Sequence, residues 1–275
     1  MAEPILRVEH LGKVFESRRG RAAVAAVDDV SFTVAPGGSL AIVGESGAGK
    51  TTVARMLLGL ETPTSGRILL AGHERDRRRL PTAERRRRAR DLQIVFQDPS
   101  TSLDPRQRVG NCLEEVLRLH SGHDRRTRGE RVLQLLYQVG LDERHVRSVP
   151  RQLSSGQCQR VAIARALAPE PKVLVLDEAV SALDVSIQGQ ILNLLSDLRA
   201  QTGVAYVFIS HDLAVVRQVT DELIVMRNGQ VVEVGRTARV LDAPRHPYTQ
   251  LLRSSVPGPG WTPRRGGLGE TPMRV

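Results

Sequence analysis

Residues 44–52, GESGAGKTT, have the spacing G-x-x-x-x-G-K-[ST], which is typical of a phosphate-binding loop. They follow an apolar run, Ser39–Val43, that predicts a buried strand, and they precede Val53–Leu60, which predicts a helix beginning near Lys50. Glycines allow such a loop to turn so tightly that successive backbone N–H groups point at an anion, and the helix adds its positive N-terminal end. The sequence therefore predicts that the chain binds a nucleoside triphosphate.

Two side chains of this loop have predicted roles of their own. Lys50 supplies a point charge for the β- and γ-phosphates, and the hydroxyl of Thr51 is a candidate ligand for the accompanying Mg²⁺. A glycine-rich turn that binds nothing is the alternative, but it leaves the full motif in its strand–loop–helix context unexplained. The residues expected to contact the nucleotide here are Gly44, Glu45, Ser46, Gly47, Ala48, Gly49, Lys50, Thr51 and Thr52.

Two adjacent carboxylates follow another apolar run. Residues 173–178 read VLVLDE, which predicts a strand buried on both faces that delivers Asp177 at its carboxyl end. With a phosphate loop upstream, Asp177 would hold Mg²⁺, usually through water, and Glu178 could polarise an attacking water. Two acids that merely end a strand are the common alternative, and the upstream loop favours the functional interpretation.

Residues 153–157, LSSGQ, precede another predicted helix, for which Ser154 is a candidate N-cap. The apolar face of this helix is predicted to consist of Cys158, Val161, Ala162 and Ala166. By itself, this pattern indicates only a capped amphipathic helix.

In combination with the phosphate loop and VLVLDE, the LSSGQ segment resembles the signature motif of the ATP-binding cassette (ABC) ATPases, whose usual form is LSGGQ. Ser155 departs from that form and adds a side chain near the expected phosphate. Gln97 in VFQDP resembles the Q-loop glutamine, Asp184 in SALD resembles the D-loop, and His211 in FISHD resembles the switch histidine. These markers stand in the family's order over about residues 5–255.

The resemblance implies a set of site residues for bound ATP and Mg²⁺. Phe15 stands where the family places an aromatic ring against adenine, although a lone phenylalanine could equally belong to the core. Besides the loop residues, the implied nucleotide contacts are Phe15, Gln97, Ser154, Ser155, Gly156, Gln157 and Asp184. The implied Mg²⁺ ligands are Thr51, Gln97 and Asp177, and the implied catalytic residues are Glu178 and His211.

The elements around these motifs predict an α/β fold with a mainly parallel sheet, because helices separate the later strands. Further strands are expected at residues 5–15, 30–34, 67–70, 92–96, 204–209, 223–226 and 231–234. A turn is expected at 17–21, Asn228-Gly229 predicts a hairpin, and residues 98–151 carry a helical pattern. The resemblance implies a P-loop NTPase fold of the ABC type over 5–255, with an antiparallel β subdomain and a helical subdomain at residues 98–165.

The segments VFQDPSTSLDPR, DEAVSALDVSIQGQILNLL, YVFISHDLAVV and HPYTQLLRSSVP together resemble the oligopeptide, dipeptide and nickel importers among the ABC ATPases. Within that subfamily they resemble the second ATPase subunit of peptide permeases. The HPYT segment is expected at residues 244–257, and the Gly-, Pro- and Arg-rich tail at 258–275 is expected to be disordered. Many relatives bind an iron–sulfur cluster through cysteines after the HPYT segment, and no cysteine follows Cys158 here, which excludes that cluster.

The function implied by this resemblance is ATP hydrolysis that energises peptide uptake, with nickel or another small solute as the alternative cargo. The implied partners are a second ABC ATPase subunit, two membrane-spanning permease subunits and, indirectly, an extracytoplasmic binding protein. A paralogue is favoured over a second copy, and the implied location is the cytoplasmic face of the membrane. A soluble ABC ATPase acting on DNA or ribosomes is another alternative, as is a regulatory subunit without turnover, which Glu178 and His211 disfavour.

The net charge of +10 raises the question of nucleic-acid binding, but the distribution of the charge argues against it. Residues 75–90 contain nine arginines and two acidic residues, a local charge of +7, and no aromatic side chain that could stack on bases. A solvated surface segment is the first interpretation, and contact with anionic lipid headgroups is the alternative. Cys112 and Cys158 match no metal spacing and are expected to be reduced and structural. The sequence predicts neither a membrane span nor a signal peptide, so the protein is expected to stay in the cytoplasm.

Overall fold

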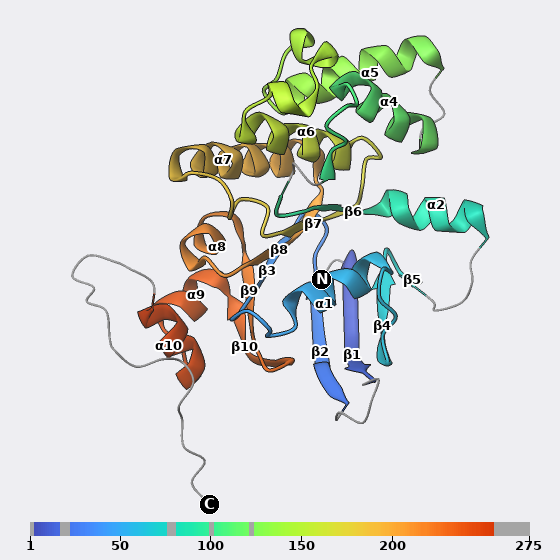
Figure 1. Cartoon of the computed structure of the whole chain (residues 1–275). Coiled ribbons are helices and arrows are strands. Elements are labelled where there is room, and N and C mark those ends of the chain that lie inside the picture. The colour runs from blue at the N-terminus through green and yellow to red at the C-terminus, as the bar shows by residue number, and fades with distance from the viewer. Residues whose placement is uncertain (1–2, 17–22, 76–80, 99–101, 121–123, 256–275) are drawn as a thin grey trace, which may run out of the picture.

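The computed structural model describes residues 3–16, 23–75, 81–98, 102–120 and 124–255. The expected turn at 17–21 and the expected tail at 258–275 lie outside these ranges. Within them, the chain forms two sheets, with a group of helices stacked on one side (Figure 1).

The larger sheet carries most of the predicted motifs and has the strand order β10-β9-β3-β8-β7-β6. Its strands are β3 (Ser39–Val43), β6 (Leu92–Val95), β7 (Val173–Asp177), β8 (Ala205–Ser210), β9 (Glu222–Arg227) and β10 (Gln230–Arg236). The strand β3 pairs in parallel with β8 and β9, and β7 pairs in parallel with β6 and β8. Because parallel strands end at the same edge of a sheet, the segments that follow β3, β7 and β8 meet there.

The smaller sheet is antiparallel and has the order β2-β1-β4-β5. Its strands are β1 (Leu6–Phe15), β2 (Val24–Val34), β4 (Ser65–Leu70) and β5 (His73–Glu74). The strand β2 begins at Val24, earlier than the predicted residue 30, because its first residues pair with β1 while remaining largely exposed. Exposed strand residues do not produce the apolar alternation on which the prediction depended.

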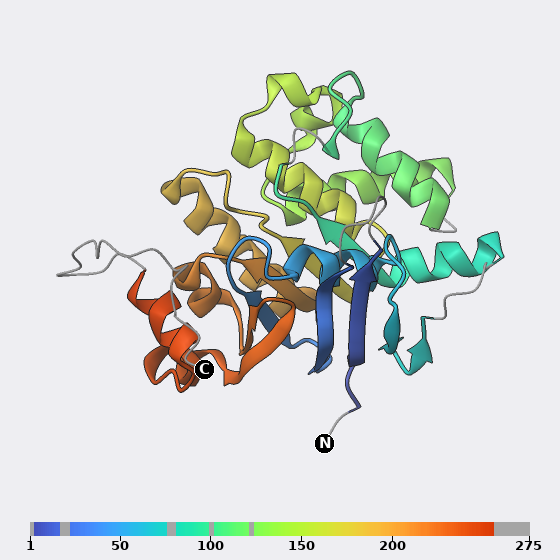
Figure 2. The same ribbon diagram turned by 60° about the horizontal axis from the view of Figure 1, so that its bottom comes forward.

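Helix α1 (Lys50–Leu58) packs between the two sheets, and the views in Figures 1 and 2 agree on this placement. Its buried residues Val53 and Met56 share one core with strands of both sheets. The helix ends at Gly59, which adopts left-handed backbone with a φ of 72°, so the predicted end at Leu60 was slightly too long. Leu60 itself is 67% exposed.

The helical group contains α4 (Val109–His120), α5 (Arg125–Gln138) and α6 (Ser155–Leu167), together with the short 3₁₀ helices η1 (Glu143–Arg147) and η2 (Pro150–Gln152). These helices share a core with α7 (Val185–Thr202) and one face of the larger sheet. Cys112 and Cys158 are buried in this core as free thiols, as predicted. The boundaries 98 and 165 of a separate helical subdomain stay a prediction.

The remaining helices lie at the sides of the larger sheet. They are α2 (Thr82–Asp91), α8 (Leu213–Val219), α9 (Thr237–Asp242) and α10 (Pro247–Ser254). The last three pack with β3 and β9 around a third core, whereas α2 has no buried residue. The predicted hairpin joins β9 to β10, where Asn228 and Gly229 adopt φ values of 49° and 82°. None of the helices in the described ranges combines the length and apolar character that a membrane crossing needs.

Candidate functional site

The phosphate loop connects β3 to α1, and two of its glycines occupy positions where a side chain would not fit. Gly44, Gly47 and Gly49 adopt φ values of 153°, 84° and 100°. A Cβ atom at Gly44 would lie 2.2 Å from the carbonyl oxygen of Met226, and one at Gly49 would lie 2.4 Å from that of Ala26. The neighbouring strands β9 and β2 therefore require glycine at both positions.

The interior of this loop fits a polyphosphate. Helix α1 begins at Lys50, and its N-cap Gly49 offers no side-chain acceptor to the first turn. Among the described residues, apart from its chain neighbours, no atom lies within 4 Å of the place that a Cβ at Gly47 would take. An uncapped helix N-terminus beside open space is a ready site for an anion.

Lys50 lies inside the loop, where it is only 7% exposed. Its Nζ donates hydrogen bonds of 2.8 Å to the carbonyl oxygens of both Gly44 and Glu45. Burial lowers the pKa of the Lys50 ammonium, while the nearby carboxylates of Glu178 and Asp177 oppose this shift. The loop thus holds a buried cation, and Thr51 and Thr52 follow it in the first turn of α1.

The end of β7 lies next to the phosphate loop and supplies two carboxylates. Asp177 is the last residue of β7, and it pairs with Ile209 of β8. Burial raises the pKa of Asp177, and the adjacent negative charge of Glu178 raises it further, while Lys50 lowers it. A cation placed here would favour the ionised form of this carboxylate and so oppose the raised pKa.

Gln97 and Asp177 line the same cavity, which has a volume of about 500 Å³. Within the described ranges, no group of three or more His, Cys, Asp or Glu side chains could hold a metal ion by itself. This arrangement fits Mg²⁺, which keeps several waters and shares its ligands with substrate phosphates. Gln97 and Asp177 could therefore take part in holding Mg²⁺ together with a nucleotide, whereas Thr51 does not line this cavity and stays a predicted ligand.

Glu178 and His211 contact each other at the edge of the larger sheet. The Nδ1 atom of His211 lies 3.1 Å from Oε1 of Glu178, although the two residues are 33 positions apart. Glu178 has a φ of 49°, an uncommon backbone conformation for a residue with a side chain. Its N–H donates to the carbonyl oxygen of Ile209, and its own carbonyl oxygen accepts from both the N–H and the hydroxyl of Ser181. These hydrogen bonds therefore hold Glu178 in its strained backbone conformation, with its carboxylate beside His211.

The LSSGQ segment caps α6 in the predicted way. The Ser154 hydroxyl accepts from the N–H of Gln157 at 3.2 Å, and the Gln157 side chain accepts from the N–H of Ser154 at 3.0 Å. A Cβ at Gly156 would lie 2.7 Å from Cγ2 of Ile187, so α6 begins close against the first turn of α7. The N-cap of α7 is Asp184, whose carboxylate accepts from the N–H of Ile187 at 2.9 Å.

The structure does not bring the signature segment to this chain's own phosphate loop. Ser154, Ser155 and Asp184 are exposed. Within the described part of the chain, no hydrogen bond joins residues 153–157 to residues 44–52. The two groups of predicted nucleotide contacts are therefore separate surfaces of the folded chain.

Phe15 is an exposed side chain at the end of β1, not a core residue. It is 42% exposed, and the Nζ of Lys13 lies 4.9 Å from the centroid of its ring. A ring with a free face can stack on a flat base, so its predicted contact with adenine stays a prediction.

Tyr248, in the HPYT segment, is a residue of this site that the sequence motifs do not indicate. The N–H of Glu45 donates a hydrogen bond of 3.0 Å to the Tyr248 hydroxyl, across 203 positions of the chain. The guanidinium carbon of Arg227 lies 4.9 Å from the centroid of the tyrosine ring. No spacing in the sequence signals a contact between residues so far apart.

Two family models match this chain, one over the phosphate loop and β7 and the other over the segment that contains Tyr248. The family model described as "ABC transporter" matches residues 27–181, and the one described as "Oligopeptide/dipeptide transporter, C-terminal region" matches residues 232–273. The chain is 47% identical, over 259 residues, to the di/tripeptide transport ATP-binding protein DppF of Pseudomonas aeruginosa, covering 93% of this chain and 80% of that protein. It is 47% identical to the glutathione import ATP-binding protein GsiA of Escherichia coli, again over 93% of this chain but only 41% of the relative.

Solved structures agree with the fold. The dimeric post-hydrolysis state of the ATP-binding cassette MJ0796, bound to ADP and Pi, superposes with a TM-score of 0.72 and 29% identity, covering 84% of this chain and 98% of that one. The cbiO1 protein from Clostridium perfringens, part of the ABC transporter complex cbiONQ, superposes with a TM-score of 0.76 and 28% identity, over 87% and 91% of the two chains.

Proposed function

Because the chain belongs to the ABC transporter family, we propose that it is the ATP-hydrolysing subunit of an importer that takes up small peptides across the cytoplasmic membrane. The proposal that the cargo is a peptide rests on the match of residues 232–273 to the C-terminal region of oligopeptide and dipeptide transporters. The names of the curated relatives state di/tripeptide transport and glutathione import, and glutathione is itself a tripeptide.

The roles of the site residues follow from their placement. The loop at 44–52 would bind the phosphates through its backbone N–H groups and Lys50, with Phe15 against the adenine. Thr51, Gln97 and Asp177 would hold Mg²⁺, which supplies charge neutralisation at the phosphates. The remaining proposed nucleotide contacts lie away from this chain's own loop; they are Ser154, Ser155, Gly156, Gln157 and Asp184.

Hydrolysis would depend on the contact between Glu178 and His211. Glu178 is the general base that orients a water and accepts its proton, because it lies just after the end of β7, next to Asp177. His211 lies 3.1 Å from this carboxylate and would hold it in place while contacting the γ-phosphate. A subunit that only binds ATP would need neither residue.

The exposed signature segment points to a second subunit. Residues 153–157 are separate from this chain's own loop, so we propose that they contact ATP held by another ABC ATPase subunit, with Asp184 linking the two sites. A paralogue is favoured over a second copy. Two membrane-spanning permease subunits and an extracytoplasmic binding protein would complete the importer, with α4 and the segment after Gln97 as the docking surface at the cytoplasmic face.

Uptake measurements test the cargo. Cells that lack the gene, and that have no redundant peptide importer, are given labelled dipeptide, glutathione or nickel, and are complemented with the wild-type gene or the Lys50→Ala variant. We expect peptide uptake to fall without the gene and to return with the wild type but not with the variant. Undiminished peptide uptake would contradict the proposal, and a loss confined to nickel would assign the importer to that cargo instead.

A further inference from the structure

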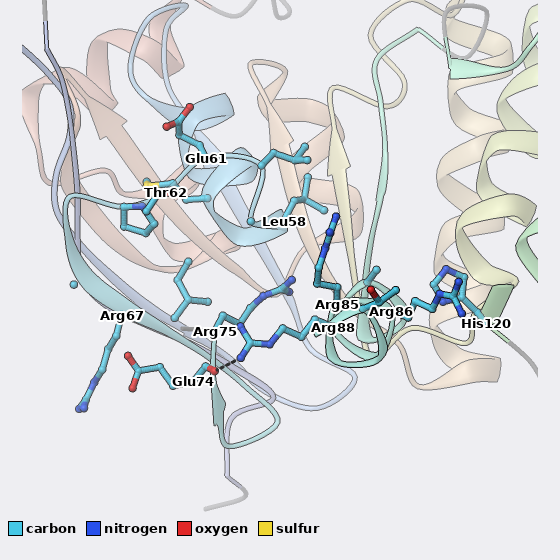
Figure 3. A pocket seen from close by; sticks show the side chains of 18 of the residues that line it. Leu58, Glu61, Thr62, Arg67, Glu74, Arg75, Arg85, Arg86, Arg88 and His120 are labelled. Atoms are coloured by element: carbon cyan, nitrogen blue, oxygen red, sulfur yellow. Dashed lines mark hydrogen bonds between the residues drawn. The ribbon is translucent and has the colours of Figure 1, made fainter. Parts of the chain in front are cut away.

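A cavity of about 1210 Å³ lies at the carboxyl end of α1, between that helix, the β4–β5 hairpin, α2 and the end of α4 (Figure 3). Its basic lining residues are Arg67, Arg75, Arg85, Arg86, Arg88 and His120. The phosphate loop is at the opposite end of the nine-residue helix α1, so this cavity is distinct from the proposed ATP site.

The cavity has two acidic lining residues, Glu61 and Glu74, against five arginines. Glu61 is engaged by Lys13, whose Nζ lies 2.5 Å from its carboxylate. Glu74 offers its backbone carbonyl oxygen, which accepts a hydrogen bond of 3.3 Å from Arg88. Arg67 is paired outside the cavity with Glu9 at 2.5 Å, and Arg88 pairs with Glu84 at 3.1 Å. Among the described residues, Arg75, Arg85 and Arg86 are the lining arginines that form no ion pair with a carboxylate.

Arg75 is the decisive residue. Its Nη1 atom is buried and has no hydrogen-bond partner among the described residues. Burial lowers the pKa of Arg75 to about 10, and the nearby charge of Arg88 adds to this shift. A buried guanidinium nitrogen without an acceptor, next to a second guanidinium, is costly unless an anion enters.

The side chains around Arg75 converge on the same space. In Figure 3, Arg88 lies beside Arg75, Arg85 extends toward Leu58, and Arg86 lies beside His120. Burial lowers the pKa of His120, and the nearby charges of Arg86 and Arg90 lower it further. In the described ranges, the guanidinium groups of Arg85 and Arg86 make no hydrogen bond.

We propose that this cavity is a binding site for a phosphate-bearing anion, with Arg75 and Arg88 as its principal ligands and Arg85 at its rim. A guanidinium group is planar and binds phosphate oxygens in pairs. A phosphoryl group offers at least three oxygens, so several arginines can share it, whereas a carboxylate offers two. The anion is either a soluble phosphate compound or the headgroup of a phospholipid.

The first experiment titrates inorganic pyrophosphate into the full-length protein by calorimetry, in the wild type and in the Lys50→Ala variant, in which the phosphate loop has lost its cation. We expect both proteins to bind pyrophosphate at the cavity. In the Lys50→Ala background, Arg75→Gln and Arg88→Gln should each weaken this binding about tenfold or more, because each removes a charged hydrogen bond. Arg87→Gln is the matched control, since Arg87 lies on α2 and pairs with Glu84, as Arg88 does, but does not line the cavity.

The second arm sediments the same proteins with vesicles of phosphatidylglycerol or of phosphatidylcholine. Binding to phosphatidylglycerol that Arg75→Gln abolishes and Arg87→Gln preserves assigns a lipid headgroup, and pyrophosphate binding without vesicle binding assigns a soluble anion. Thermal unfolding identifies any variant that fails to fold, and Arg75→Lys then replaces Arg75→Gln, because it keeps the charge but loses the planar fork. The proposal is overturned if the binding of pyrophosphate and the binding of phosphatidylglycerol vesicles are both unchanged by Arg75→Gln and Arg88→Gln.

Discussion

The hydroxyl of Tyr248 accepts a hydrogen bond of 3.0 Å from the backbone N–H of Glu45, the residue that follows the first glycine of the phosphate loop. Tyr248 is 3% exposed, and burial raises the pKa of its hydroxyl, so the group stays neutral at physiological pH. This bond joins helix α10, which lies within the residues that match the peptide-transporter C-terminal region, directly to the proposed ATP site.

Tyr248→Phe should weaken ATP binding. The change keeps the ring beside Arg227 but removes the acceptor that fixes the loop, so we expect the dissociation constant for ATP to rise roughly 2- to 10-fold, as for the loss of one neutral hydrogen bond. Tyr206→Phe is the matched control, because it removes a buried hydroxyl that donates 2.9 Å to the carbonyl oxygen of Leu195, away from the loop. Nucleotide titration and thermal unfolding compare the two, and an equal effect on affinity would show that Tyr248 acts only through stability.

Lys50→Ala should weaken ATP binding more strongly. It removes the buried cation of the loop while the backbone cradle remains, so the expected loss is about tenfold or more. Lys172→Ala is the control, because Lys172 is paired with Asp91 at 3.6 Å on the surface. Fluorescent-nucleotide titration makes the comparison. Equal affinity in the wild type and in Lys50→Ala would remove Lys50 from the site.

Gln159→Met should stabilise the protein. Gln159 is fully buried in α6, and neither of its amide atoms has a hydrogen-bond partner among the described residues. Methionine has a similar volume without the unsatisfied groups, so we expect the free energy of unfolding to rise by about 1–3 kcal/mol. Gln190→Met, on the exposed face of α7, controls for helix propensity. A urea titration that finds Gln159→Met less stable than the control would show that the amide is satisfied in solution.

The parts of the site that could be predicted from the sequence rest on local patterns. The phosphate loop is fixed by glycine spacing between a strand and a helix, and both elements are present. The hairpin at Asn228-Gly229 follows from two adjacent residues that tolerate positive φ. Asp177 ends its strand as predicted, because an apolar run that stops at a carboxylate marks both the strand and its edge.

The contacts between distant segments could not be predicted from those patterns. The pairing of Glu178 with His211 depends on β7 and β8 being neighbours in the sheet, which the sequence does not state. His211 could be placed only through the resemblance to the ABC family. The bond from Glu45 to Tyr248 and the burial of Arg75 depend on packing of elements far apart in the chain, and no periodicity of the sequence reports them.

The most direct test of the account is the turnover of Glu178→Gln in the assembled complex. The partner ATPase subunit carries a change of its own equivalent glutamate, so that hydrolysis reports on this chain's carboxylate alone. Glu143→Gln, an exposed residue of η1, is the control in the same complex.

We expect Glu178→Gln to lower phosphate release roughly 10²-fold or more relative to Glu143→Gln, because a general base is lost. ATP affinity should stay within a few-fold, because Lys50 and the loop backbone are untouched. The loss of negative charge near the γ-phosphate should also favour the closed, ATP-loaded assembly in sedimentation. Phosphate release by Glu178→Gln at close to the rate of Glu143→Gln would contradict the assignment of Glu178 as the catalytic base.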